Sequence, residues 1–120
     1  MADILVVDDD DVIRDTLCEL LAVDHNCEQA KTAEDALRKL EAQSFDVVLT
    51  DITMPYMDGV ALIRALARMG SKIPVLASTG LSEKSCIAEL RELGVADILH
   101  KPYTAAVLTR AMHAALQGVE

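Results

Sequence analysis

The sequence has few aromatic and few basic residues, and each shortage disfavours a class of function. Phe45, Tyr56 and Tyr103 are the only aromatic residues among 120, and tryptophan is absent. Rings that could sandwich a flavin are therefore scarce. The 20 acidic residues outnumber the 11 Lys and Arg residues, so the formal net charge is −9. Because nucleic acids are bound by clustered Lys and Arg, we expect no direct contact with nucleic acid.

Long apolar runs and cysteine motifs are also missing. No apolar run approaches the ~18 residues of a membrane span, and the amino terminus lacks the basic and apolar regions of a signal peptide. Cys18, Cys27 and Cys86 form neither a Cys-x-x-Cys pair nor a zinc pattern with histidine. We therefore expect three reduced, mostly buried thiols in a soluble cytoplasmic protein that does not contact a membrane.

The chain also has no Gly/Ser-rich linker, no low-complexity tract and no internal repeat. Its 120 residues suit one domain, which is long enough to bury a core without disulfides or structural metals. We expect residues 1–120 to form this single domain.

Short apolar runs alternate with amphipathic segments along the whole chain. The apolar runs predict strands at residues 3–8, 26–31, 45–50, 73–78 and 95–99. Helices are expected between and after them, ending near residue 24, beginning at a capping box at 32–35, and covering 60–69, 82–94 and 104–116. In the first helix, the spacing predicts one core-facing stripe made of Ile13, Leu17, Leu20 and Leu21.

Alternation of five strands with five helices predicts a parallel sheet covered on both faces, because parallel strands need crossover connections. The natural arrangement is a doubly wound, flavodoxin-like α/β fold with strand order 2-1-3-4-5. In this order the first and third strands are neighbours at the switch point, where ligands bind beyond the strand ends. Asp8 ends the first strand, Asp9 comes directly after it, and Asp51 follows the third strand, so these three carboxylates should meet.

Three carboxylates packed together repel one another, which raises their affinity for a proton or a hard cation. With few ligands at an open and hydrated edge, Mg²⁺ is favoured over Ca²⁺. We expect Asp9 and Asp51 to bind the metal directly and Asp8 to act through a water molecule. The backbone carbonyl of Thr53 completes the expected ligand set.

The other strand ends bring groups that bind phosphate. Thr79 supplies a hydroxyl between Ser78 and Gly80, and Lys101 supplies a mobile positive charge. A carboxylate nucleophile can accept a phosphoryl group as an aspartyl phosphate while a metal and an ammonium group offset the charge. Asp51 is the expected nucleophile. Taken singly, each of these residues also has a structural interpretation as a helix-start acid, a strand cap or a surface lysine.

With these residues in this order, the chain resembles response-regulator receiver domains of two-component signalling over essentially its full length. The matching positions are the acid pair Asp8 and Asp9, the phosphoacceptor Asp51, the pairs Met54-Pro55 and Asp58-Gly59, the switch hydroxyl Thr79, and the phosphate-sensing Lys101 before Pro102. The peptide bond preceding this proline is cis in such domains, and cis bonds are essentially a proline phenomenon.

The resemblance implies phosphotransfer to Asp51, with Mg²⁺ present, from a phosphohistidine on a histidine kinase or phosphotransfer protein, or from a small donor. Thr79 then moves toward the phosphoryl group. The surface formed by the fourth and fifth strands and their helices changes its affinity for a downstream protein, which is a population shift between two states. Such a module acts on itself and is not an enzyme for an external metabolite.

Two positions depart from the pattern of the family. Ile98 stands three positions before Lys101, where these domains often have an aromatic residue that swings inward with the threonine. Leu81 stands two positions past Thr79. In these domains the side chain at this position, and the one at the position of Thr53, often positions water for hydrolysis. Because leucine cannot hydrogen-bond water, we expect slow loss of the phosphoryl group.

Alternatives remain at this stage. A flavodoxin-like FMN-binding module shares the sheet order, although its phosphate loop follows the first strand and not the fourth. A pseudo-receiver that serves as a binding scaffold would usually lack an acid, the threonine or the lysine, and none is missing here. The chain resembles stand-alone receivers and those fused to hybrid histidine kinases equally. His25, His100 and His113 have no ligand-spaced partner and receive no chemical role.

Overall fold

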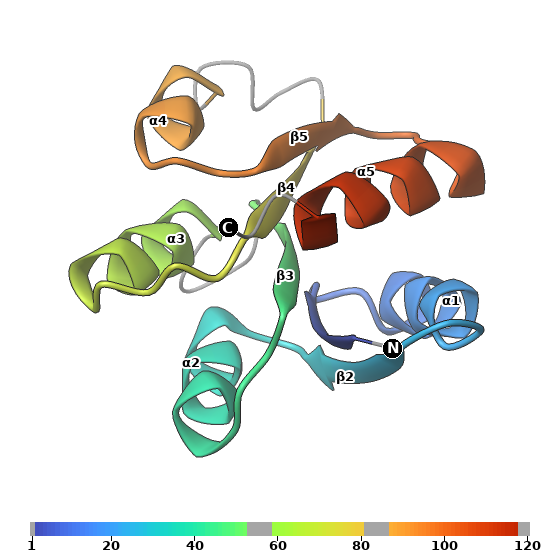
Figure 1. Cartoon of the computed structure of the whole chain (residues 1–120), viewed down its shortest axis with the longest axis horizontal. Helices are drawn as coiled ribbons and strands as arrows, with labels where there is room; N and C mark the ends of the chain where they lie inside the picture. Colours follow the sequence, from blue (N-terminus) through green and yellow to red (C-terminus); the bar gives the residue numbers. More distant parts are fainter. Residues whose placement is uncertain (1, 53–58, 81–86, 118–120) are drawn as a thin grey trace.

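The computed structural model describes residues 2–52, 59–80 and 87–117. Within them, five parallel strands form one sheet in the order β2-β1-β3-β4-β5, and five helices flank it (Figure 1). The predicted doubly wound fold and its strand order are confirmed. No helix in the described part of the chain is long and apolar enough to cross a membrane.

The strands end together at one edge of the sheet. Their bounds are Asp3–Val7 for β1, Asn26–Ala30 for β2, Val47–Asp51 for β3, Val75–Thr79 for β4 and Asp97–His100 for β5. The register pairs Val7 with Thr50, Asp51 with Ser78, and Thr79 with His100. The residues that follow β1, β3, β4 and β5 therefore meet at the edge where parallel α/β sheets bind ligands.

The last three strands begin two residues later than predicted. The predictions of residues 45, 73 and 95 as first residues were wrong because an apolar residue there packs without joining the sheet. Phe45 is buried in the core, and Ile73 and Val95 pack against the same core from the connecting segments. An apolar run shows which residues are buried, and buried residues extend beyond the hydrogen-bonded strand into the segment before it.

The helices form one layer on each face of the sheet. Their bounds are Asp11–Leu21 for α1, Ala33–Ala42 for α2, Gly59–Arg68 for α3, Ile87–Glu92 for α4 and Ala105–Gln117 for α5. α1 and α5 cover one face, whereas α2, α3 and α4 cover the other (Figure 1). Asp10 caps α1 and Thr32 caps α2 by accepting hydrogen bonds from backbone N–H groups of the first turn, and the cap at Thr32 agrees with the helix start predicted at residues 32–35.

The buried face of α1 is rotated from the predicted stripe. Leu17 and Leu21 are buried, but Leu20 is 46% exposed, so its assignment to the core was wrong. Arg14 is buried instead. At 100° per residue, Arg14, Leu17 and Leu21 share one side of the helix and Leu20 lies outside it. A charged residue thus lies on the buried side of the helix, and a leucine that the apolar pattern assigned to the core is exposed.

Two of the cysteines also differ from expectation. Cys18 on α1 and Cys27 on β2 form a disulfide, with their Cα atoms 5.7 Å apart. That separation lies within the usual range for disulfides. The prediction of three reduced thiols was therefore wrong for this pair, and Cys86 lies outside the described residues. The chain reverses between α1 and β2, which brings the two cysteines face to face although no spacing motif marks them.

Candidate functional site

Three carboxylates converge at the ends of β1 and β3. Asp8 follows β1, Asp51 ends β3, and these strands are neighbours in the sheet. Asp8, Asp9 and Asp51 each offer a carboxylate oxygen, and these atoms all lie within 4.8 Å of one another. The structure thus brings together the acids that the sequence pattern placed at the switch point.

Burial governs the ionisation of Asp8, which is only 3% exposed. Burial is the main cause that raises the pKa of its carboxyl to about 6, and repulsion from Asp51 and Asp9 adds to the rise. The backbone N–H of Asp10 donates a hydrogen bond of 2.9 Å to Asp8 Oδ1, which acts in the opposite direction. A carboxylate in this environment is stabilised by a nearby cation.

Lys101 supplies positive charge from the end of β5. It follows β5, and its Nζ lies 3.3 Å from Asp51 Oδ2 and 3.9 Å from Asp8 Oδ2. Partial burial acts to lower the pKa of the ammonium group, but attraction to Asp51 and Asp8 outweighs it and leaves the pKa above its usual value. Lys101 is therefore charged at neutral pH and links the two acids. The Lys101-Pro102 peptide bond is cis, as expected.

Hydroxyl groups end β4 beside the acids. Thr79 is the last residue of β4 and is 1% exposed. Its Oγ1 shares a hydrogen bond of 3.2 Å with Nδ1 of His100, the residue opposite it on β5. The preceding Ser78 donates from its hydroxyl to that of Tyr103 at 3.4 Å. His100 was given no role from the sequence, yet it contacts the expected switch hydroxyl.

The chain matches one protein family over most of its length. The family model described as the response regulator receiver domain matches residues 4–113. The chain belongs to this family. The domain is thus a module of two-component signalling, and both its fold and the order of its acids, hydroxyl and lysine agree with the resemblance noted from the sequence.

The chain is similar to parts of longer proteins of different kinds. It is 37% identical over 114 residues to a protein-glutamate methylesterase/protein-glutamine glutaminase of Nocardioides sp., covering 91% of this chain and 31% of the relative. It is 32% identical to the transcriptional regulatory protein FixJ of Bradyrhizobium diazoefficiens, covering 98% of this chain and 58% of FixJ. This chain therefore spans less than two thirds of the length of these relatives.

Solved receiver structures agree closely with the receiver domain described here. A response regulator receiver domain protein from Clostridium thermocellum superposes with a TM-score of 0.89 at 30% identity, covering 98% of this chain and 95% of that one. The structure of FixJ-N gives a TM-score of 0.90 at 27% identity, again with 98% and 95% coverage.

Arg14 is a residue of the site that sequence reasoning missed. This buried side chain of the receiver domain donates from Nη1 to the backbone carbonyl of Asp8 at 2.7 Å and from Nε to Gln29 Oε1 at 3.1 Å. Its Nη2 also contacts the carboxylate of Asp11. Arg14 thus fixes the backbone of Asp8 to α1 and β2. The available signal was an arginine on the inner side of an amphipathic helix, one turn after the acid run.

Gly59 holds the start of α3 close to the end of β3. A Cβ atom at this residue would lie 2.3 Å from the backbone oxygen of Asp51 and 2.5 Å from Cα of Ile52. Only glycine permits this approach without a backbone shift. The expected carbonyl ligand Thr53, the Met54-Pro55 pair, Asp58 and Leu81 lie outside the described residues.

The donor set fits a hard divalent cation. Asp8, Asp9 and Asp51 offer only carboxylate oxygens, which suit Mg²⁺, and they lie at the open edge of the sheet where water can complete the coordination. Asp9 is the most exposed of the three.

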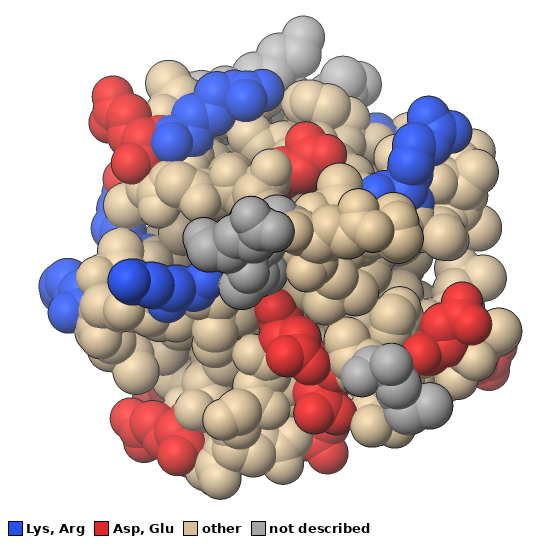
Figure 2. All heavy atoms as spheres, in the orientation of Figure 1, with Lys and Arg blue, Asp and Glu red and all other residues tan. Residues whose placement is uncertain are grey.

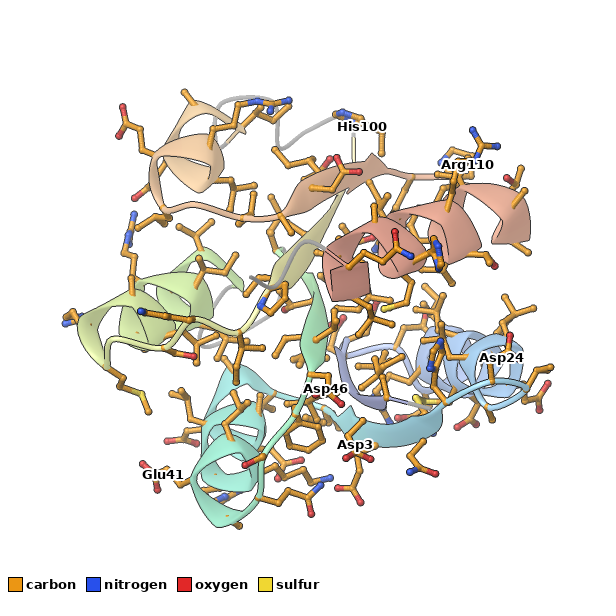
Figure 3. The ribbon with its side chains drawn as sticks, in the orientation of Figure 1. Asp3, Asp24, Glu41, Asp46, His100 and Arg110 are labelled. Atoms are coloured by element: carbon orange, nitrogen blue, oxygen red, sulfur yellow. A yellow bond between two sulfur atoms is a disulfide. The ribbon has the colours of Figure 1, made fainter. Side chains whose placement is uncertain are left out.

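Acidic and basic side chains are interspersed on the face shown in Figure 2, and the basic ones lie mostly in its upper half. Lys and Arg side chains lie mainly over α3, α4 and α5, and Asp and Glu side chains lie over α2, around Asp3, Asp24 and Asp46, and also over α4 and near β5 (Figures 2 and 3). No continuous basic surface covers this face among the described residues. This distribution agrees with the net negative charge of the receiver domain.

Proposed function

We propose that this receiver domain accepts a phosphoryl group on Asp51 with Mg²⁺ present and thereby switches the binding of a partner protein. The observation that carries the proposal is the meeting of the Asp8, Asp9 and Asp51 carboxylates with the Lys101 ammonium group, 3.3 Å from Asp51. Acids alone would suggest only a cation site. The lysine adds a charge that can bind a phosphoryl oxygen.

The chemistry follows from these groups. A carboxylate oxygen of Asp51 forms a bond to phosphorus while the bond from phosphorus to the donor histidine nitrogen breaks. The histidine keeps the electron pair of that bond and takes up a proton. Lys101 offsets negative charge on the transferred group. Asp9 and Asp51, with Asp8 through water and the Thr53 carbonyl, would hold Mg²⁺, which when bound neutralises charge on the phosphoryl oxygens.

The switch is proposed for the side formed by β4, β5 and the helices α4 and α5. Thr79 turns toward the phosphoryl group, and Lys101 changes partner from the free carboxylate to the phosphorylated one. The donor is a histidine kinase or a histidine phosphotransfer protein, and the output is a downstream protein that binds this side. The domain acts on itself and not on an external substrate.

Three further proposals complete this account. Residues 1–120 form one receiver domain, in agreement with a family match over 4–113. The domain works in the cytoplasm, where its histidine-phosphorylated donor acts, and it does so without direct contact with a membrane or with nucleic acid; its net charge of −9 disfavours nucleic-acid binding. The aspartyl phosphate is lost slowly, because Leu81 cannot position water. A phosphorylated half-life of only seconds in Mg²⁺ buffer would contradict this last proposal.

Phosphorylation by a small donor tests the function. The protein is incubated with acetyl phosphate, with and without Mg²⁺, and its intact mass is followed alongside that of Asp51→Asn. The expected result is one phosphoryl adduct on the wild type, dependent on Mg²⁺ and absent from the variant. If Mg²⁺ binds but no adduct forms, the pseudo-receiver scaffold is the better interpretation. The FMN-binding alternative loses its support because the chain belongs to the receiver family.

A further inference from the structure

The hydroxyl of Thr79 is bonded on the side of β4 that faces away from the phosphoacceptor. β4 lies between β3, which ends in Asp51, and β5, which ends in His100. Thr79 is paired with His100 across the sheet, and their Oγ1 and Nδ1 atoms are 3.2 Å apart. A group bonded to His100 on the β5 side is therefore turned away from a phosphoryl group at the end of β3.

A hydroxyl that points to His100 on the β5 side cannot also reach a phosphoryl group at the end of β3 without a change of side-chain direction. Threonine is branched at Cβ and occupies a few staggered χ1 positions, so a change of partner requires a rotation of the side chain. Thr79 is 1% exposed, so water has little access to replace a lost hydrogen bond. The His100 bond and the phosphoryl bond therefore compete directly.

The neighbouring residue on the same side of β5 cannot make this contact. Ile98 has no polar side-chain atom, is 8% exposed and packs in the core beside α4. His100, two residues along the strand, projects at the end of β5 and is exposed (Figure 3). It can leave its position without opening the core. An exposed polar ring thus contacts the buried hydroxyl of Thr79.

We propose that His100 is a positioning residue that holds the Thr79 hydroxyl on the β5 side until Asp51 carries a phosphoryl group. When Thr79 turns, its hydrogen bond to His100 breaks and the ring is released at the surface beside α4 and α5. The bond thereby stabilises the unphosphorylated state, and its release carries the signal to the β5 surface. This inference rests on the proposed phosphorylation of Asp51.

The test measures the affinity of the domain for beryllofluoride, a phosphoryl mimic, in Mg²⁺ buffer by amide NMR titration. His100→Ala removes the competing bond and should tighten binding about two- to tenfold, the range expected for one neutral hydrogen bond. His100→Asn can still present a polar atom near the place of Nδ1 and should remain close to wild type. His113→Ala, which alters an exposed histidine on α5, should change nothing.

A double-variant comparison separates this role from a general effect on structure. Thr79→Val removes the hydroxyl, so His100→Ala should have no further effect on affinity in that background. The side-chain nitrogen signals of the three histidines give a direct readout. Those of His100 should shift when the mimic binds, whereas those of His25 and His113 should not.

The outcomes are distinguishable. Equal or weaker binding by His100→Ala would overturn the inference, as would an effect of the same size in the Thr79→Val background. Failure of His100→Asn to restore wild-type affinity would also count against a hydrogen-bonding role. If the wild type itself does not bind the mimic, the proposed function fails and the inference fails with it.

Discussion

The two sides of the site are held in different ways. On the α1–β2 side, Arg14 of α1 donates hydrogen bonds to the backbone carbonyl of Asp8 and to the side chain of Gln29 on β2. The Cys18–Cys27 disulfide joins the same helix to the same strand. On the β4–β5 side, the expected switch hydroxyl of Thr79 is bonded to an exposed histidine. The side that positions the acids is held by a buried arginine and a disulfide, whereas the side on which switching is proposed is held by one hydrogen bond to an exposed ring.

This difference suits a two-state module. A metal site needs its ligands in place before the phosphoryl group arrives, because ordering them during the reaction would reduce the rate. A switch needs states separated by a few kcal/mol, so that one new interaction can change their populations. Stability should therefore depend mainly on the α1–β2 side, and switching mainly on the β4–β5 side. The predictions below test this division.

Arg14→Met should have the largest effect on stability. The methionine keeps the apolar stem but leaves the Asp8 carbonyl without its buried donor, which should lower the free energy of unfolding by about 3 kcal/mol. Urea unfolding measures this, and a Mg²⁺ titration should show weaker binding because Asp8 is less well positioned. Arg110→Ala, on the outer side of α5 (Figure 3), is the matched control and should be nearly neutral. Equal stability of the two variants would contradict a fixed α1–β2 side.

Reduction of the disulfide should have the next largest effect. Cys18 and Cys27 are nine residues apart, and closing so short a loop stabilises a protein by about 2.5 kcal/mol in the chain-entropy model. Urea unfolding with and without reductant should show this loss. The Cys18→Ser/Cys27→Ser variant should start at the lower stability and show no further response to reductant. A wild type that is insensitive to reductant would remove the disulfide from the account.

Asp8→Asn should stabilise the domain in the absence of Mg²⁺, because it removes a buried charge. The pKa of Asp8 is raised to about 6, so the folded state binds a proton more tightly than the unfolded state does. Wild-type stability from this group is thus present below pH 4 and lost as pH rises through about 6. The variant should gain about 1–2 kcal/mol at pH 7.5, and the gain should shrink toward pH 4. A gain that does not vary with pH would exclude this cause.

His100→Ala should have the smallest effect on stability, about 0.5–1.5 kcal/mol, because it removes one neutral hydrogen bond to the buried Thr79 hydroxyl. Its effect on mimic affinity should nevertheless exceed that of Arg110→Ala. Urea unfolding and beryllofluoride titration of the same preparations give both quantities. A large loss of stability with unchanged affinity would reverse the proposed division between the two sides.

The fold and the acid cluster were predictable because both follow from order along the chain. Alternating strands and helices specify a doubly wound sheet, and strand ends that carry Asp8 and Asp51 must then become neighbours. Lys101 was predictable for the same reason. Its position after β5 brings it to the edge that holds the acids, within 3.3 Å of Asp51.

The missed features depend on how elements are rotated against one another. The apolar pattern does not specify how α1 is rotated about its axis, and the observed rotation buries Arg14 and exposes Leu20. Cys18 and Cys27 meet only because that helix packs on β2 in this orientation. His100 reaches Thr79 through the register of β4 and β5, which a strand pattern accurate to two residues cannot give. Such contacts depend on side-chain packing that a single sequence does not reveal.

Amide chemical shifts recorded before and after beryllofluoride is added in Mg²⁺ buffer distinguish a fixed metal side from a mobile switch side. The account predicts shifts at Asp51 and along the β4–β5 side, including Thr79 and His100, with Cys27 and Gln29 on β2 nearly unchanged. Asp51→Asn should show none of them. Shifts of equal size on β2 and β5, or a mimic-independent spectrum in the wild type, would contradict a fixed metal side beside a mobile switch side.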